Sequence, residues 1–193
     1  MKIKKYKYFP IILLALMFFF NSLFSNSQTT NSSYTVLKKI GKVELREYKP
    51  LLFVSYQNNN SINNQNSSFR VLADYIFGAN EKNEKIAMTS PVVINLNNNR
   101  EMLFRIPKKY NRKNIPKPKN NEIKIVSKEK IIKATIRYSG YTSEQKENKM
   151  IEQLKKILLE NDIAHINKFE LFIYDPPYKP FNRINEISVN IIN

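Results

Sequence analysis

The sequence predicts an α+β fold, in which two helices pack on mostly antiparallel strands and the order strands, helix, strands occurs twice. Two observations support this prediction. Short apolar segments typical of strands flank two longer segments whose apolar residues recur with the helical period. The two halves share this order but not their residues, which indicates a pseudo-twofold duplication of structure.

The first half begins with three expected strands, at residues 36–40, 42–48 and 51–56. Gly41 provides the turn between the first two, and apolar and polar residues alternate in the second, as in a half-buried strand. An Asn- and Ser-rich tract at 58–68 follows. Its lack of apolar residues indicates a loop.

The first helix is expected to begin at Ser68, a good N-cap residue, and to reach Phe77, with Gly78 as its C-terminal stop. Its apolar residues recur at the spacing of one helix face. They are Phe69, Leu72, Ala73, Ile76 and Phe77.

A hairpin follows the first helix. Its strands are expected at 85–96 and 102–106, with an Asn-rich turn at 97–99 between them. A proline-containing connector at 107–121 then separates the two halves of the chain.

The second half repeats this order. Strands are expected at 122–127 and 131–139, and a capping box of Thr142 and Gln145 begins a helix that reaches about Asn161. The buried face of this helix is expected to consist of Met150, Leu154, Ile157 and Leu158.

The closing strands are expected at 169–174 and 185–192, with three prolines in the loop between them. Residues 34–193 thus contain every expected element. Their number is enough for one domain with a hydrophobic core. We therefore expect a single domain over this range.

The first 27 residues have the pattern of a secretory signal peptide. Lysines are concentrated near the N-terminus, an apolar run occupies 11–20, and a small-x-small motif ends at Ser27. Cleavage there would leave Gln28 as the first residue, a polar tail at 28–33, and a secreted or periplasmic protein. The apolar run of about ten residues is half of the roughly 20 that a spanning helix needs. An uncleaved membrane anchor is the alternative.

The composition restricts the chemistry of the chain. There is no cysteine, which excludes disulfides, acylation of a cysteine, a thiolate haem ligand and Cys-based zinc sites. The formal charge is +16, or about +12 without the four lysines of the leader, and favours anionic partners: nucleic acid, anionic lipid or an acidic small molecule. Lys and Asn also have AT-rich codons, so genome composition is a second explanation of the charge.

No residue pattern indicates a catalytic or metal site. The one histidine, His165, cannot form a zinc site alone and is expected in a loop after the second helix, although an imidazole is chemically able to bind haem iron. Ser90, His165 and Asp175 could form a hydrolase triad, but nothing in their spacing brings them together. Paired glutamates stand beside Lys or Arg, as solvated ion pairs do. The chain is therefore expected to be a non-enzyme without a metal site.

Four segments in a fixed order resemble the SOUL family of haem-binding proteins. They are YIFGAN at 75–80, IAMTSPV at 86–92, YDPP at 174–177 and RINEI at 183–187. The resemblance extends over about 34–191. It implies a distorted antiparallel β-barrel of pseudo-twofold symmetry flanked by two helices, and reversible binding of haem or a related tetrapyrrole. The second of these segments and the residues around Glu186 are expected to be structural.

The resemblance also implies where the tetrapyrrole binds, namely between the first helix and the loop that follows residue 173. The residues expected there are Phe69, Leu72, Ala73, Ile76, Tyr174, Tyr178 and Lys179. Lys179 would meet a haem propionate, and the haem would be held non-covalently without a strong axial ligand. This chain has Asn66 and Asp74 where relatives have basic residues, and Arg70 could compensate. The apolar helix residues could instead face the core.

These observations predict a haem or tetrapyrrole carrier, buffer or scavenger that performs no turnover and binds no nucleic acid. One alternative is a module of the same fold that binds a different ligand or a protein. A second alternative is a binder of nucleic acid or anionic membranes, in which association depends on the positive charge and is strongly sensitive to salt.

Overall fold

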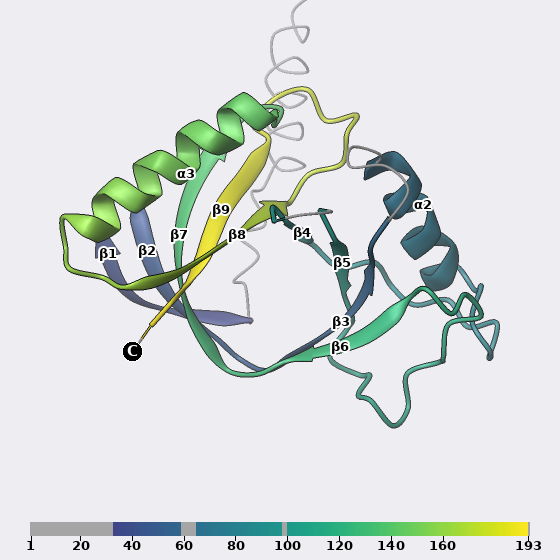
Figure 1. Ribbon diagram of the computed structural model, residues 1–193. Helices are drawn as coiled ribbons and strands as arrows, with labels where there is room; N and C mark the ends of the chain where they lie inside the picture. Colours follow the sequence, from purple (N-terminus) through teal and green to yellow (C-terminus); the bar gives the residue numbers. More distant parts are fainter. Residues whose placement is uncertain (1–32, 59–64, 98–99, 193) are drawn as a thin grey trace, which may run out of the picture. The chain divides into compact units, whose positions relative to one another are not determined.

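The computed structural model describes residues 33–58, 65–97 and 100–192. They form one antiparallel sheet of nine strands and two helices, which confirms the α+β prediction (Figure 1). The expected signal peptide and polar tail, most of the Asn/Ser tract and part of the 97–99 turn lie outside the described residues. Neither helix among the described residues is long and apolar enough to cross a membrane.

In chain order, the elements are β1 (Tyr34–Ile40), β2 (Val43–Tyr48), β3 (Leu51–Tyr56), α2 (Gln65–Ile76), β4 (Val92–Asn95), β5 (Met102–Arg105), β6 (Lys124–Lys128), β7 (Ile131–Ser139), α3 (Glu144–Leu159), β8 (His165–Ile173) and β9 (Ile184–Ile191). Strands β3 and β7 have the predicted bounds.

The topology repeats itself. The strand order across the sheet is β1-β2-β7-β9-β8-β4-β5-β3-β6. In the first half, β3, α2, β4 and β5 follow one another along the chain and the strands lie in the order β3-β5-β4. In the second half β7, α3, β8 and β9 do the same, in the order β7-β9-β8. The outer strands are exchanged between the two halves. Strand β2 comes from the first half of the chain but pairs with β7 of the second, and β6 comes from the second half but pairs with β3 of the first. The predicted duplication is therefore present in the strand order.

The predicted barrel is not confirmed. Strands β1 and β6 are the two ends of the ladder, and each pairs with one neighbour within the described residues. The sheet is therefore open along the strand order. Figure 1 shows that it is strongly curved, in keeping with the twist of long antiparallel sheets.

The two faces of the sheet carry different cores. Because successive side chains of a strand point to opposite faces, Val54 and Ile94 lie in the large core beneath both helices, whereas their neighbours Phe53 and Val93 lie on the second face. The smaller cluster on the second face consists of Tyr48, Phe53, Val93, Leu103 and Phe172. Both faces are thus largely buried, although helices cover only one of them.

Helix α2 begins at Gln65, three residues before the predicted start. Ser68 is buried inside the helix, so its prediction as the N-cap is wrong. The polar first turn is helical because the apolar residues that follow dock on β3 and β5, and this packing outweighs the weak helix propensity of Asn and Ser. At the other end, the N–H of Ala79 bonds to the carbonyl of Asp74, and Gly78 adopts φ 123°, which favours glycine.

Helix α3 is capped by Ser143 rather than by the predicted Thr142. The Ser143 hydroxyl accepts the N–H of Lys146 at 3.3 Å. The Thr142 hydroxyl instead donates to the Glu147 carboxylate at 3.0 Å, so the capping box with Gln145 does not form. The predicted buried face is present: Met150, Leu154 and Leu158 are buried, and Ile157 is partly buried.

The strand predicted at 85–96 is wrong over its first half, since only Val92–Asn95 is a strand. Residues 85–91 form an irregular segment whose polar groups bond to other elements. The Ile86 N–H bonds to the Ile76 carbonyl, and the Thr89 hydroxyl donates to the Arg105 carbonyl. Ile86 and Pro91 of this segment are buried, whereas Ala87 and Met88 are exposed, and the segment does not form a strand.

Candidate functional site

The candidate site lies where α2 faces the loop at 174–183, which we call the late loop. The Phe69 ring of α2 packs edge-on against Phe104 of β5, with centroids 5.2 Å apart. Phe104 pairs with Val92 of β4, and Val92 pairs with Ile173, the last residue of β8 before the late loop. Neighbouring strands are about 4.8 Å apart, so Phe104 and Ile173 are about 10 Å apart. The start of α2 and the late loop therefore lie at the same end of the sheet.

The late loop is held in place by its own hydrogen bonds. The Asp175 carboxylate accepts the N–H of Ile184 at 2.6 Å and the ammonium of Lys179 at 2.7 Å. The buried Arg183 guanidinium donates to the carbonyls of Pro176, Lys179 and Asp175. The hydrogen bonds of the Arg183 guanidinium therefore go to backbone carbonyls inside the loop.

Exposed apolar side chains gather around this end of the sheet. Phe69 is 39 %, Tyr178 84 % and Phe181 78 % exposed. Met88 and Tyr141 are exposed as well, and the Tyr141 hydroxyl donates to the carbonyl of Pro177 in the late loop. Exposed aromatic side chains close together are typical of interaction sites. Among these residues the sequence nominated only Phe69 and Tyr178 for the site, since exposure depends on tertiary packing.

Three of the predicted helix residues are in the core instead. Leu72 and Ile76 are 0 % and 1 % exposed, and Ala73 is also buried. They pack against the strands, whereas Phe69 is exposed and Val71 is partly buried in the same turns of α2. Arg70 and Asp74 are exposed on the same helix. The role of Leu72, Ala73 and Ile76 in ligand binding stays a prediction. Because all three are buried, they would have to support the ligand surface from the core beneath it.

The predicted cation of the site already has a partner. Lys179 is partly exposed and forms an ion pair with Asp175 at 2.7 Å. Burial opposes ionisation of Asp175, but hydrogen bonds from Lys179 and the Ile184 N–H outweigh it and hold the pKa of Asp175 below its usual value. A ligand carboxylate would therefore share or displace an existing partner of Lys179.

Tyr174 connects the late loop to a buried ionic cluster on the second face. Its hydroxyl donates to Glu186 of β9 at 2.7 Å. Glu186 is fully buried and accepts two hydrogen bonds from Arg46 of β2, at 2.8 and 3.0 Å, and one from Arg137 of β7 at 2.9 Å. The cluster ties four segments together, so these residues have a structural role.

The charge of Glu186 is retained in the folded state. Burial raises the pKa of this carboxyl, but the hydrogen bonds and charge of Arg46 outweigh burial and hold the pKa below the usual value. A second cluster on the same face joins Glu170 to Lys128 and Lys133, at 2.6 and 2.5 Å. Both clusters are satisfied by protein groups.

The histidine is far from the candidate site. His165 is the first residue of β8, not a loop residue as predicted, and Tyr174 follows nine positions later, directly after the strand, which is about 30 Å at the usual rise. The Ser90 hydroxyl donates to the Tyr174 carbonyl at 3.0 Å, so Ser90 and Asp175 lie at the opposite end of the strand from His165. The three do not form a triad.

The residues at the candidate site suit a flat apolar ligand with an acidic edge. Phe69, Tyr178 and Phe181 offer apolar contacts, Lys179 offers a cation, and no imidazole is near enough to reach a central metal. Among the described residues, no group of three or more His, Cys, Asp or Glu could hold a metal ion. A haem placed at this surface would be held by apolar contacts and by its propionates.

The duplicated sheet, with both helices on one face, defines an α+β protein of pseudo-twofold design with an exposed aromatic surface at one end. Residues 29–190 match the family model described as SOUL heme-binding protein, and the chain therefore belongs to the SOUL family. Heme-binding protein 1 of Xenopus laevis is 31 % identical over 154 residues, which cover 75 % of this chain and 80 % of that protein.

Two solved structures are similar in fold. The EcmrR C-terminal domain is 12 % identical with a TM-score of 0.55, over 83 % of this chain and 98 % of the other. A hydrolase from Listeria innocua is 10 % identical with a TM-score of 0.57, over 86 % and 97 %. At these identities the likeness concerns the fold alone.

Proposed function

We propose that the protein binds haem or a related tetrapyrrole reversibly at the surface between α2 and the late loop, as a carrier, buffer or scavenger without turnover. The family and the relatives named Heme-binding protein 1 support this class of ligand. The observation that carries the proposal is the exposure of Phe69, Tyr178 and Phe181 at the end of the sheet where Lys179 stands. A flat dianion matches these groups in shape and charge.

The expected affinity is moderate. Covering a few hundred Å² of apolar surface at about 25 cal/mol/Å² yields several kcal/mol before the cost of association. The exposed Lys179 adds at most about 1 kcal/mol to this total, and its pairing with Asp175 reduces the gain. We therefore propose micromolar binding, and haem held without a strong axial ligand. The one histidine is at the far end of β8 and would not reach the iron.

Substitutions on the proposed surface are expected to weaken hemin binding. Phe69→Asp and Tyr178→Asp should each raise the Kd about tenfold, because each removes roughly 50 Å² of apolar contact and adds a charge that repels a propionate. Lys179→Glu should raise it about fivefold. The measurement is a titration of each variant with hemin, followed by its Soret absorption.

Matched controls separate the site from the fold and from the iron. Phe77→Asp changes an exposed residue at the other end of the same helical segment, about 12 Å away, and should leave the Kd within about twofold, as should His165→Ala. Tyr178 is exposed, so its substitution reports on binding even if Phe69→Asp loosens the packing on Phe104. Loss of binding in His165→Ala alone would reject the proposed surface.

We also propose that the chain is exported, with the signal peptide removed after Ser27, and acts as a secreted or periplasmic protein. The basic and apolar pattern of the first 20 residues supports this location. Mass spectrometry of the protein recovered from its own cells should find an N-terminus at Gln28. A protein that retains Met1 would contradict the proposal.

A further inference from the structure

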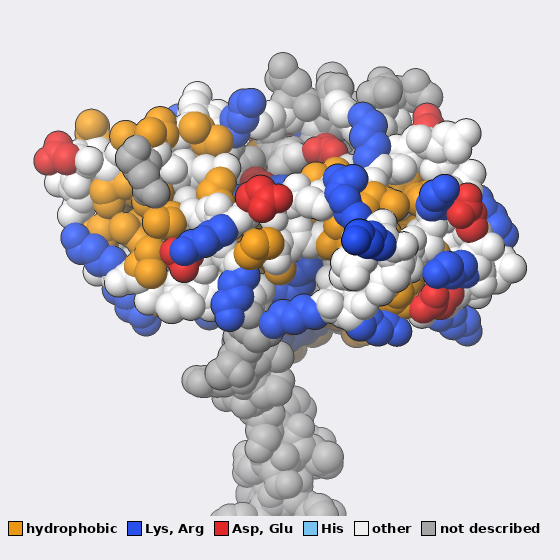
Figure 2. Space-filling view, turned by 90° about the horizontal axis from the view of Figure 1, so that it is seen from below, with side chains coloured by type: hydrophobic (Ala, Val, Ile, Leu, Met, Phe, Trp, Pro, Cys, Tyr) orange, Lys and Arg blue, Asp and Glu red, His pale blue; other side chains and the backbone are white. Residues whose placement is uncertain are grey.

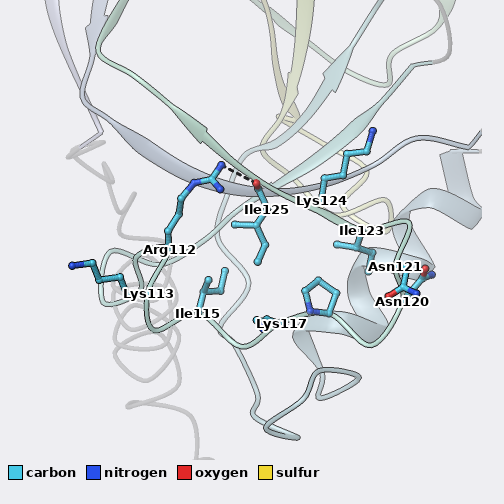
Figure 3. A pocket seen from close by; sticks show the side chains of 10 residues that line it. Arg112, Lys113, Ile115, Lys117, Asn120, Asn121, Ile123, Lys124 and Ile125 are labelled. Atoms are coloured by element: carbon cyan, nitrogen blue, oxygen red, sulfur yellow. Dashed lines mark hydrogen bonds between the residues drawn. The ribbon is translucent and has the colours of Figure 1, made fainter.

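A hollow lies far along the sheet from the late loop, between the 107–121 connector and the edge strand β6. Its volume is 540 Å³, and its lining includes Ile115, Ile123 and Ile125 (Figure 3). Figure 3 shows Ile115 and Ile125 pointing into the hollow from opposite sides. Ile115 and Ile123 are buried and Ile125 is partly so, which makes the floor apolar. The volume is within the range of small-molecule sites.

The walls of the hollow are held by contacts between the connector and the body of the domain. Arg112 of the connector donates to the Ser127 hydroxyl at 2.7 Å and to the Ile125 carbonyl at 3.1 Å, both on β6. At the other side, the Tyr75 hydroxyl of α2 donates to the Pro116 carbonyl at 2.7 Å. The connector is therefore attached at both sides of the hollow, and the site is formed before any ligand arrives.

The charge around the hollow is positive and unneutralised. Within the described part of the chain, its lining includes Arg112, Lys113, Lys117 and Lys124 and no carboxylate. Among the described residues, none of these four cations forms an ion pair. Glu122, which follows the connector, does not line the hollow; burial and the neighbouring Glu122 raise the pKa of the Tyr56 phenol. Figure 3 shows Lys113 and Lys124 extending away from the hollow, so from these positions they contribute to the positive field around it.

We propose that this hollow binds an amphipathic organic anion: a small molecule with an apolar body and a carboxylate, sulfonate or phosphate group. The isoleucine floor would take the apolar body, while Arg112, Lys117 and the amides of Asn120 and Asn121 stand at the rim. No aromatic side chain of the residues that the structure describes lines the hollow, so the base stacking on which single-stranded nucleic acids depend is lacking. The site is separate from the proposed tetrapyrrole surface and does not depend on it.

The test uses anilinonaphthalene sulfonate, an aryl sulfonate whose fluorescence rises in apolar sites. Lys113→Glu/Lys117→Glu should weaken saturable binding of this probe to the full chain by about fivefold. Lys149→Glu/Lys168→Glu makes the same change of charge on exposed residues of α3 and β8, and should change the affinity by less than about twofold. Far-UV circular dichroism checks that both variants fold. Lys179→Glu should leave unchanged the component of probe binding that depends on Lys113 and Lys117, which distinguishes the hollow from the tetrapyrrole surface.

Three results would overturn the proposal. Equal weakening in both double variants would show attraction by net charge alone. The absence of a saturable phase that depends on Lys113 and Lys117 would show that the hollow does not take an aryl anion. Binding of duplex DNA but not of the probe, lost in Lys113→Glu/Lys117→Glu, would identify a nucleic-acid surface instead. Where the probe binds in the hollow, competition by added hemin then shows whether the hollow takes a tetrapyrrole or another organic anion.

Discussion

Glu186→Gln is expected to lower the free energy of unfolding by about 3–5 kcal/mol. The carboxylate of Glu186 is fully buried on the second face of the sheet and accepts hydrogen bonds from Arg46, Arg137 and Tyr174. The amide keeps the shape but removes the negative charge, which leaves the buried Arg46 guanidinium without its main counter-charge. Urea denaturation at neutral pH measures the loss.

A double variant separates the cost of an unpaired charge from the net value of the pair. Arg46→Met/Glu186→Leu removes both charges and should recover most of the stability lost in Glu186→Gln, because buried ion pairs are often no better than apolar packing. Arg137 also loses Glu186 in this variant, but water can hydrate its guanidinium, since the side chain is already half exposed. Glu144→Gln on the exposed face of α3 should cost less than about 0.5 kcal/mol. Equal losses for Glu144 and Glu186 would contradict the importance of the buried cluster.

The same cluster contributes to the response of stability to acid. The pKa of Glu186 is held below its usual value of 4.5, so its contribution to stability is complete above that value and is lost as the pH falls through the folded-state pKa. Unfolding free energies at pH 7 and near pH 3 should differ less in Glu186→Gln than in the unchanged protein, because the variant has already lost this contribution.

Leu158→Ala is expected to destabilise the fold by about 2–5 kcal/mol, because it leaves a cavity where α3 packs on the sheet. Leu159→Ala is a matched control. The two leucines are adjacent in the same helix, yet Leu158 is 0 % and Leu159 79 % exposed. The Leu159 substitution should change the unfolding free energy by less than about 0.5 kcal/mol. Similar losses at the two positions would mean that α3 does not dock as described.

Regular elements were predictable where the local pattern agrees with the packing. Strand Ile131–Ser139 has the predicted bounds because its alternating side chains reflect the two faces of one sheet. Strand Leu51–Tyr56 has them because a short apolar run is typical of a strand that is buried on both faces. The strand predicted at 85–96 is wrong over residues 85–91, because the carbonyls that bond to this segment belong to Ile76 and Arg105. Contacts between distant segments leave no local signal that distinguishes a strand from a buried irregular segment.

The candidate site was predictable only in part, for the same reason. The helical period identified a stripe from Phe69 to Phe77, but the docking of α2 on β3 and β5 decides which members are buried. Leu72 and Ile76 are core residues, whereas Phe69 is accessible. The sequence also did not reveal the ion-pair partner of Glu186, since Arg46 is 140 residues away in the chain. Figure 2 shows the molecule from below the view of Figure 1, with basic side chains scattered among apolar patches. Because the basic residues are scattered on this face, the net charge of the sequence alone did not indicate a site.

The central claim is that the surface between α2 and the late loop holds a flat apolar dianion without coordinating its metal. A parallel titration of the protein with hemin and with metal-free protoporphyrin IX tests it most directly. We expect saturable one-to-one binding in the micromolar range for both, with Kd values within about tenfold of each other. Absorption that stays unchanged at tens of micromolar of either porphyrin, or binding of the iron form alone, would contradict the claim.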